Sequence, residues 1–219
     1  MKWVTRDFVH LDRVASPWLI QRFVDTQAQF IFVPWGQEDT RPSDAIPLGM
    51  PGVALSSHDE HGTTFAKILR KYALDDPSLH HIATIIQAGV DHVLHHAKAG
   101  PDDRWAQIAV GLLAISEGVM LLHDTDDAIL EASFPIYDAL YANLHAHALV
   151  KEKNLQIPDY QGLGPTLPTR FLRQVLNGPD LKAQGPGLLV LKAWSRAWKW
   201  HAIKRHIRHA KFWRPPPWP

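Results

Sequence analysis

The sequence predicts a mainly helical α+β domain, in which a small N-terminal sheet packs on a bundle of helices. Short β-like and helical patterns alternate near the N-terminus, and long helical patterns fill the middle of the chain. A basic stretch rich in tryptophan follows, and it predicts a C-terminal helix. The 219 residues, 46% of them hydrophobic, are enough for one core. We therefore expect one domain at residues 1–150, and a linker with a helical extension that packs on it at residues 151–219.

The N-terminal sheet is predicted from a strand–helix–strand pattern. Residues 2–5 and 29–34 read as strands, because both are rich in β-branched and aromatic residues. Residues 11–25 between them read as a helix whose first position suits Pro17. Two strands joined by a helix favour a parallel pair, since a parallel connection needs a crossover. A third strand is expected at 52–55 (GVAL), where it leads into a polar segment.

Helical periodicity begins near residue 64 and continues through most of the remaining chain. Apolar residues at helical spacing predict helices at 65–74, 78–98, 104–123, 126–150, 168–176 and 188–213. The helix at 104–123 is so apolar that we expect it to be buried on most sides. Pro135 implies a break or a kink in the helix that follows, because proline cannot donate a backbone hydrogen bond.

Composition and motifs exclude several functional classes. The chain has no cysteine, so disulfides and thiolate chemistry are excluded. It has no glycine-rich phosphate loop, dinucleotide fingerprint or nucleophile elbow, which disfavours nucleotide-binding and acyl-hydrolase functions. No apolar run has the length of a signal-peptide core or a membrane span, and we expect a cytoplasmic protein.

Charge is distributed unevenly along the chain. The segment after Asp180 contains nine of the 23 Lys and Arg and no acidic residue. The rest of the chain therefore holds 14 basic and 22 acidic residues, a balance of −8. We expect Trp194 and Trp198, on one face of the predicted helix, to pack on the acidic body of the same chain or of a second subunit in a homodimer. Binding of nucleic acid by the basic helix is the second choice.

The polar segment SSHDEHG at 56–62 contains four candidate metal ligands. Imidazole and carboxylate groups together suit a divalent Zn, Mn or Fe ion, which is the expected cofactor. His58 is the first predicted ligand and His61 is the reserve. Since adjacent residues of an extended segment point to opposite sides, the four side chains cannot all bind one ion. The alternative is a solvated loop that caps the helix starting near Thr64.

The second part of the predicted metal site lies on the apolar helix. Glu117 is embedded in LLAISEGVMLL, and a buried carboxylate is costly unless it is paired or coordinated. Asp124, two turns later on roughly the same face, is predicted as a further ligand. The alternative is a structural ion pair between Glu117 and a buried arginine, either Arg13 or Arg22.

Three residues are candidates for catalysis. Arg13 or Arg22 could hold an anionic or oxygen-rich substrate through charge-assisted hydrogen bonds. Tyr141 shares a helix face with Tyr137 and His145, which predicts the edge of the core and also allows a place in the lining of a pocket. A metal at the predicted site would act as a Lewis acid or hold a reactive water.

Four segments carry a resemblance to a known family. They are MKWVTR at 1–6, LDRVASPWLIQRFVDTQAQFIFVP at 11–34, GLLAIS at 111–116 and YDALYA at 137–142. Over about residues 1–145, the sequence resembles the C-terminal domain of the chromate-resistance ChrB family. The resemblance implies an association with chromate resistance, and ChrB proteins are described as chromate-responsive regulators with a separate N-terminal region. This chain starts at the C-terminal domain, which weakens the expectation of a classical repressor.

The sequence departs from the family pattern at three positions. Ser16 and Thr63 stand where cysteine is common, and Asp127 stands near the place of a common histidine. Thiol chemistry of relatives is therefore not expected here. The leading function is a metal-binding ChrB-like protein, leaning to a metal-dependent enzyme that acts on a small oxygen-rich or anionic molecule. The alternative is a chromate-responsive regulator or oxyanion sensor that contacts nucleic acid through the basic C-terminal helix.

Overall fold

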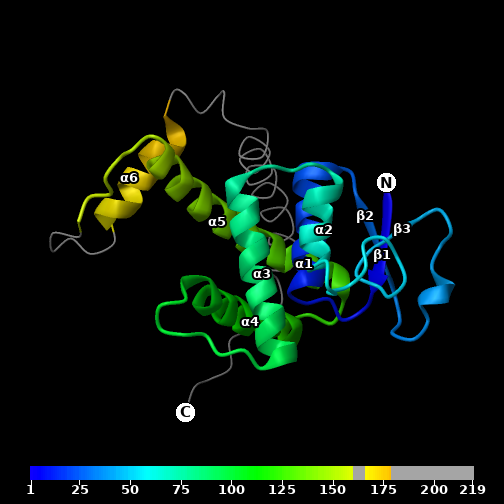
Figure 1. Cartoon of the computed structure of the whole chain (residues 1–219). Helices are drawn as coiled ribbons and strands as arrows, with labels where there is room; N and C mark the ends of the chain where they lie inside the picture. Colours follow the sequence, from blue (N-terminus) through cyan, green and yellow to red (C-terminus); the bar gives the residue numbers. More distant parts are fainter. Residues whose placement is uncertain (160–165, 179–219) are drawn as a thin grey trace, which may run out of the picture.

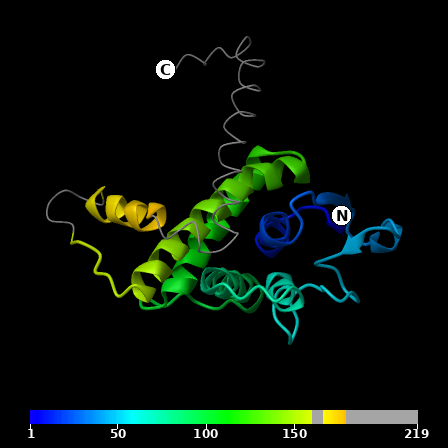
Figure 2. The ribbon, with the colours of Figure 1, turned by 90° about the horizontal axis from the view of Figure 1, so that it is seen from above.

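A computed structural model describes residues 1–159 and 166–178 of the chain (Figure 1). These residues form a mainly helical α+β fold, as predicted, with a small sheet and six α-helices. The sheet lies at one end beside α1 and α2, and α6 lies beyond the far end of α5 (Figures 1 and 2). Helix α5 is the central element, because it contacts α1, α3, α4 and α6. The predicted helix at 188–213 falls outside the described residues.

The sheet has three strands in the order β2–β1–β3, and both pairings are parallel. β1 (Lys2–Arg6) lies between β2 (Gln29–Val33) and the short β3 (Ile46–Pro47). The predicted parallel strand–helix–strand unit is confirmed. Because the strands are parallel, their carboxyl ends lie along one edge of the sheet.

The prediction of a third strand at 52–55 is wrong. Those residues form turns, and the third strand lies instead at Ile46–Pro47. Gly52 has a φ of 71°, in the left-handed region, so a regular extended strand does not pass through it. The N–H of Leu48 donates to the carbonyl of Val4, which continues the pairing of β3 with β1.

The helix after β1 begins earlier than its proline suggests. α1 (Asp12–Leu19) contains Pro17 in its interior and not at its first position. It continues as a π-helical segment, η1 (Ile20–Val24). Proline has no N–H to donate, so one backbone hydrogen bond of the helix is absent there. The early start leaves a short loop between β1 and α1, and residues of this loop line the candidate site described below.

The later helices are confirmed with small shifts at their ends. They are α2 (Thr64–Lys71), α3 (Pro77–His95), α4 (Arg104–Leu122), α5 (Asp126–Glu152) and α6 (Thr166–Asn177). Polar side chains accept hydrogen bonds from backbone N–H groups in the first turns of α2 to α5, and they explain where these helices begin. These caps are Thr63, Asp76, Asp103 and Thr125. Of the two outcomes predicted at Pro135, a break or a kink, the break does not occur, because α5 runs through that residue.

Helix α4 is less buried than its apolar sequence predicts. Only 28% of its apolar stretch is buried, and Ile115, Leu121 and Leu122 are exposed. The helix contacts α3 and α5, but these contacts do not cover its whole surface. The expectation of burial on most sides is therefore wrong. By length and composition alone α4 could cross a membrane, although the sequence was interpreted as having no apolar run of that length. One such helix is weak evidence for a span, because helices of soluble proteins meet the same criteria.

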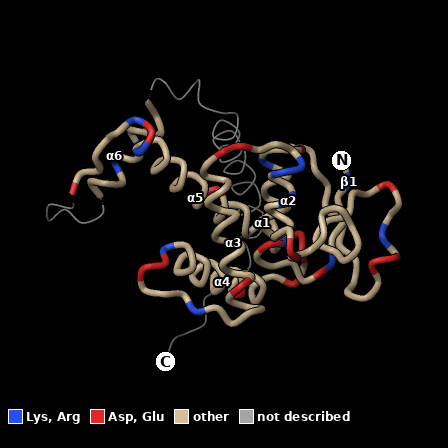
Figure 3. Tube along the Cα trace, viewed as in Figure 1, with Lys and Arg blue, Asp and Glu red and all other residues tan. Residues whose placement is uncertain are grey.

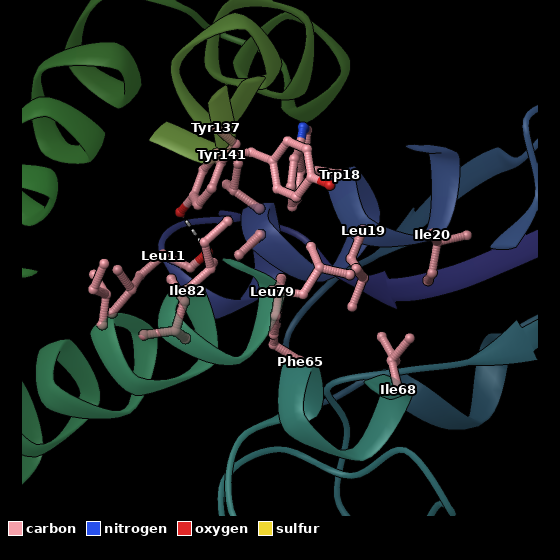
Figure 4. Close-up of a cluster of buried hydrophobic side chains, with 14 of the residues drawn as sticks. Leu11, Trp18, Leu19, Ile20, Phe65, Ile68, Leu79, Ile82, Tyr137 and Tyr141 are labelled. Atoms are coloured by element: carbon pink, nitrogen blue, oxygen red, sulfur yellow. Dashed lines mark hydrogen bonds between the residues drawn. The ribbon is translucent and has the colours of Figure 1, made fainter. Parts of the chain in front are cut away.

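The main core lies between the sheet and the helices and includes the fully buried Trp18, which lies beside Tyr137 and Tyr141 (Figure 4). The ring of Trp18 stacks on that of Phe65, with 6.4 Å between centroids. It also contacts Tyr137 and Tyr141, at 5.8 and 6.1 Å. Trp3 of β1 is fully buried in the same cluster. This aromatic core holds α1, α2 and α5 together and so fixes the position of the loops at the edge of the sheet.

Candidate functional site

A pocket of about 360 Å³ lies at the carboxyl edge of the sheet. Its lining includes Arg6 at the end of β1, Arg13 in α1 and Trp35 just after β2, together with residues near the end of α3. In sheets of parallel strands, ligands commonly bind outside the carboxyl ends of the strands. We call this site the arginine pocket, and its position makes it the candidate functional site.

Arg6 is held by an aromatic ring and by polar groups of two loops. Its guanidinium carbon lies 3.6 Å from the centroid of the Trp35 ring. One terminal nitrogen donates to the carbonyl of Gly49 at 3.3 Å, and the other lies 3.6 Å from a carboxylate oxygen of Glu38. The Nε atom of Arg6 is buried and has no hydrogen-bond partner within the described part of the chain. A buried donor without an acceptor is costly, so this atom favours an acceptor supplied by a ligand.

Arg13 is also buried, and its hydrogen bonds go to neutral groups. The guanidinium donates to the backbone carbonyls of Arg6, Asp7 and Phe8 at 3.1, 2.7 and 2.8 Å. Burial, followed by the charge of Arg6, lowers the pKa of Arg13 to about 10, so the group stays charged at neutral pH. These three bonds do not use all the N–H donors of the guanidinium. Arg13 can therefore still donate to an anion.

The loop between β1 and α1 has a strained backbone. Phe8 and Leu11 have positive φ values of 55° and 46°, which cost non-glycine residues about 1–3 kcal/mol each. The carboxylate of Asp126 accepts hydrogen bonds from the N–H of Phe8 and of the next residue. The hydroxyl of Tyr137 donates to the carbonyl of Leu11 at 3.2 Å, as the dashed line in Figure 4 shows. These bonds from α5 hold the loop, and with it His10, at the pocket.

His10 adds a titratable group to the lining of the pocket. Burial lowers its pKa below the ordinary value, and the positive charge of Arg13 lowers it further. A hydrogen bond with the backbone of Phe8 and then the negative charges of Glu117 and Asp12 raise the pKa, and these effects are weaker. The ring is therefore neutral at neutral pH. Its Nδ1 atom is buried and has no partner among the described residues, so it can take part in binding a ligand.

Asp12, the carboxylate in the pocket lining, already accepts three hydrogen bonds. Asp12 accepts from the N–H groups of Thr64 and Phe65 at 2.9 and 3.0 Å and from the hydroxyl of Ser16 at 3.1 Å, and it thereby caps the start of α2. The charged groups in the lining are thus two arginines and one committed carboxylate. Figure 3 shows acidic and basic residues mixed along the loops around β1. The positive character of the pocket is therefore local.

The SSHDEHG segment forms mainly a structural turn. One carboxylate oxygen of Asp59 accepts from Lys67 at 2.7 Å and from Ser56 at 2.8 Å. The bond from Lys67 is the main cause that holds the pKa of Asp59 below its ordinary value. His61 is exposed and lies outside the arginine pocket. His58 is also exposed, but it contributes to the lining of the pocket.

The other two predicted metal ligands lie on the surface. Glu117 and Asp124 are both exposed, so the prediction that Glu117 is buried is wrong. Leu113 and Ser116 are buried in α4, whereas Glu117, which follows Ser116, is exposed at the edge of that buried face. Among residues 1–159 and 166–178, no three His, Asp or Glu side chains are placed to hold a metal ion together. The structure therefore does not unite the four predicted ligands.

Arg22 and Tyr141 have partners away from the arginine pocket. Two nitrogens of Arg22 donate to both carboxylate oxygens of Asp138, at 3.0 and 3.1 Å. The indole N–H of Trp18 donates to the same carboxylate at 2.7 Å. The hydroxyl of Tyr141 donates to Asp76 at 2.6 Å, and burial, followed by this bond, raises the pKa of Tyr141 above its ordinary value. Of the three predicted catalytic residues, Arg13 alone lines the pocket.

Arg6, His10 and Trp35 are among the pocket residues that sequence reasoning missed. A signal existed for two of them, because Arg6 ends one predicted strand and Trp35 follows the other. The carboxyl ends of parallel strands meet at one edge, so charged and aromatic residues there are candidates for binding. The sequence carries no such signal for His10, because its position depends on the unusual backbone of its neighbours.

The fold and the pocket define an α+β domain with a cationic site at the carboxyl edge of a small parallel sheet. Residues 3–144 match the family described as ChrB, C-terminal domain, and the chain belongs to this family. The resemblance predicted from the sequence is thus confirmed. A relative, Protein ChrB of Cupriavidus metallidurans, is 31% identical over 145 residues, which are 65% of this chain and 40% of the relative. The chain therefore matches less than half the length of that protein. No solved structure matches the chain significantly.

Proposed function

We propose that this domain binds a small molecule through an oxyanion group in the arginine pocket. One observation carries the proposal: two buried arginines meet at the edge of the sheet, Arg13 bonded to neutral carbonyls and Arg6 with an unpaired Nε. Guanidinium groups suit oxyanions because they form paired, charge-assisted hydrogen bonds with them. Burial strengthens these bonds, since the local dielectric constant is lower than that of water.

Membership of the ChrB family makes chromate one candidate for the oxyanion. Chromate is a tetrahedral dianion with the shape of sulfate, and it could accept hydrogen bonds from both arginines and from His10. If chromate is the ligand, the domain is the oxyanion-sensing part of a chromate-responsive protein. Contact with nucleic acid through the basic segment after Asp180 belongs to the same proposal, and that segment lies outside the described residues.

A metal-dependent enzyme, which the sequence favoured, has less support. His10 and His58 both line the arginine pocket. However, no third His, Asp or Glu joins them in a metal-binding group within residues 1–159 and 166–178. The lining carboxylate, Asp12, is already committed to capping α2. Metal binding by His58, Glu117, Asp124 or His61 therefore ranks behind oxyanion binding.

Calorimetric titration of the protein with sulfate, phosphate and chromate tests oxyanion binding directly. Saturable binding is expected for the wild type. Arg13→Lys keeps the charge but loses the forked donors, and Arg6→Gln loses the charge. Each variant should bind about tenfold more weakly or worse, because a hydrogen bond to a charged group contributes about 1.5–3 kcal/mol.

Lys98→Gln is the matched control, because it removes an exposed cation that does not line the pocket. It should bind the anions as the wild type does. Circular dichroism and thermal melting of each variant separate a loss of binding from a loss of folding. The proposal fails if the wild type shows no saturable binding, or if both folded arginine variants bind as tightly as the wild type.

A further inference from the structure

We infer that the arginine pocket selects an organic anion, in which the oxyanion group carries an apolar portion, over an inorganic oxyanion of the same charge. The inference rests on the proposed function and goes further, because it specifies the class of ligand. It follows from three features of the pocket: an apolar wall, an exposed tryptophan that is held in place, and a volume larger than an inorganic oxyanion needs.

The apolar wall comes from the last turns of α3. Val90, Val93 and Leu94 all line the pocket, and none of them has a polar side-chain atom. Val90 is buried, whereas Val93 and Leu94 are 46% and 48% exposed. Large apolar side chains that remain exposed in a pocket are a mark of ligand binding, because their burial by a ligand is favourable. An inorganic oxyanion could not use this wall.

Trp35 is the second feature. Its side chain is 55% exposed, although its indole N–H donates to the carbonyl of Asp7 at 3.2 Å and its backbone N–H donates to the carboxylate of Asp7 at 3.2 Å. The ring also stacks on Arg6. An aromatic side chain that is anchored and still exposed offers a surface to a ligand at little cost in conformational entropy.

The volume of the pocket is the third feature. At roughly 30 Å³ for each water-sized group, a volume of 360 Å³ has room for about a dozen such groups. A tetrahedral oxyanion fills less than half of this space. Ligand pockets for organic molecules begin at about 300 Å³.

The charged and apolar parts of the lining come from different elements. Arg6, Arg13 and His10 belong to the end of β1, to α1 and to the loop between them, whereas the apolar wall belongs to α3. A ligand with one anionic end and one apolar end can satisfy both. The shared chemistry is an oxyanion on an organic group, and it includes phosphate esters and carboxylates.

Paired ligands that differ only in the apolar group test the inference. Calorimetric titrations of the full chain would compare phosphate with phenyl phosphate at about pH 8, where both are mainly dianions. A second pair, acetate and benzoate, distinguishes a carboxylate from a phosphate ester as the preferred anion. In at least one pair, the aromatic member should bind at least about tenfold more tightly, the scale set by apolar contacts in ligand pockets.

Two double variants assign the preference to the apolar wall. Val93→Ser with Leu94→Ser removes apolar surface from the pocket and should abolish most of the preference, while the affinity for phosphate itself stays the same. Leu121→Ser with Leu122→Ser is the matched control, because these residues of α4 are 87% and 79% exposed and do not line the pocket. It should leave both affinities unchanged.

The outcomes separate this inference from the proposed function. If phosphate or sulfate binds and needs Arg13, but neither aromatic ligand binds more tightly than its partner, the inference is wrong and oxyanion binding stands. A preference that survives in the Val93 and Leu94 double variant also overturns the inference, because the apolar wall is then not its cause. If no anion of either kind binds in a manner that depends on the arginines, both fail.

Discussion

Arg13 and Arg22 are both buried, but their surroundings are opposite. Arg22 donates to both oxygens of the Asp138 carboxylate, so its charge is matched where α1 and η1 meet α5. Arg13 donates to three backbone carbonyls, so no opposite charge is bonded to it. The first arrangement is complete by itself. The second leaves a positive charge and free donors at the edge of the sheet, next to a pocket.

This difference separates a structural arginine from a binding arginine. A buried ion pair completes its own electrostatics, and removing either partner leaves an uncompensated charge. A buried arginine held by neutral carbonyls is fixed in position, yet it gains further from an anion. In the sequence both residues belong to the same helix pattern, and both are equally suited to hold an anion. The three-dimensional surroundings alone assign the roles.

Asp138→Ala should cause the largest loss of stability, because it removes the carboxylate that pairs with the structural arginine, Arg22. Arg22 and the indole of Trp18 both lose their carboxylate acceptor. The free energy of unfolding, measured by urea denaturation, should fall by about 3–5 kcal/mol, the usual effect of removing one partner of a buried pair. Anion affinity should stay unchanged wherever the variant is folded, since Arg22 does not line the pocket.

An exposed ion pair provides the control for that variant. Lys2 donates to Asp44 at 2.7 Å, but the side chains are 48% and 62% exposed. Asp44→Ala should have a much smaller effect, because water screens such pairs. If both variants lose the same free energy of unfolding, burial is not the reason why the Arg22–Asp138 pair stabilises the fold.

Gly89→Ala should have the next largest effect, because it disturbs the loop that holds the arginine pocket. A Cβ atom at Gly89 would lie 2.9 Å from a methyl group of Leu11, the strained residue just before α1. This contact is too short, so either Leu11 or α3 must move. Such overpacking costs about 1–3 kcal/mol. Because the loop before α1 holds His10 and the carbonyls around Arg13, anion affinity should fall as well.

The combination of Gly89→Ala with Leu11→Ala checks the cause. Removing the Leu11 side chain makes room for the new methyl group, so the double variant should lose less stability than the sum of the two single variants. Urea denaturation of all four proteins measures this coupling. Additive losses would show that the contact between the two residues is not the reason for the effect.

The sequence predicted the helices well because their signals are local. The apolar spacing that predicted them lies within each helix, and the polar caps that the structure shows, such as Asp76 and Asp103, lie next to it. The third strand could not be predicted in the same way. β3 has two residues, Ile46 and Pro47, and it is defined by its pairing with Trp3 and Val4 and not by any pattern of its own.

The candidate site was predictable only in part, because it depends on contacts between distant segments. Arg13 was predicted as an anion-binding residue and lines the pocket. Glu117 was not placed correctly, because an apolar helix does not show which of its sides remains exposed. The pocket arises where the ends of β1 and β2 meet the last turns of α3, and no single segment of sequence contains that information.

The pH dependence of sulfate binding tests whether His10 takes part in the arginine pocket. In the free protein, burial and Arg13 hold the pKa of His10 below its ordinary value, against the weaker effects of the Phe8 backbone, Glu117 and Asp12. A bound anion favours the protonated ring and raises this pKa. Binding therefore takes up a proton, and affinity is greatest at low pH and falls as pH rises through the pKa of the bound state.

Calorimetry between about pH 8 and pH 5 measures this effect. The gain is at most about tenfold per pH unit, because one proton is involved. Sulfate serves as the ligand, since its own charge stays constant over this range. His10→Asn should bind sulfate with little dependence on pH. The same pH dependence in that variant would exclude His10 as the group that titrates.

Glu117→Gln should have the smallest effect on stability. An exposed carboxylate without the buried surroundings of Asp138 contributes little, and the change in the free energy of unfolding should stay within about 0.5 kcal/mol.

The same variant tests the metal site predicted from the sequence. If Glu117 binds a metal with His58 and Asp124, added Zn²⁺ should raise the melting temperature of the wild type and not that of Glu117→Gln, because a ligand of the native state stabilises it. We expect melting in Zn²⁺ and in chelator to change equally in both proteins. A Zn²⁺-dependent rise that Glu117→Gln and His58→Ala both remove would instead establish a metal site that assembles around these exposed side chains.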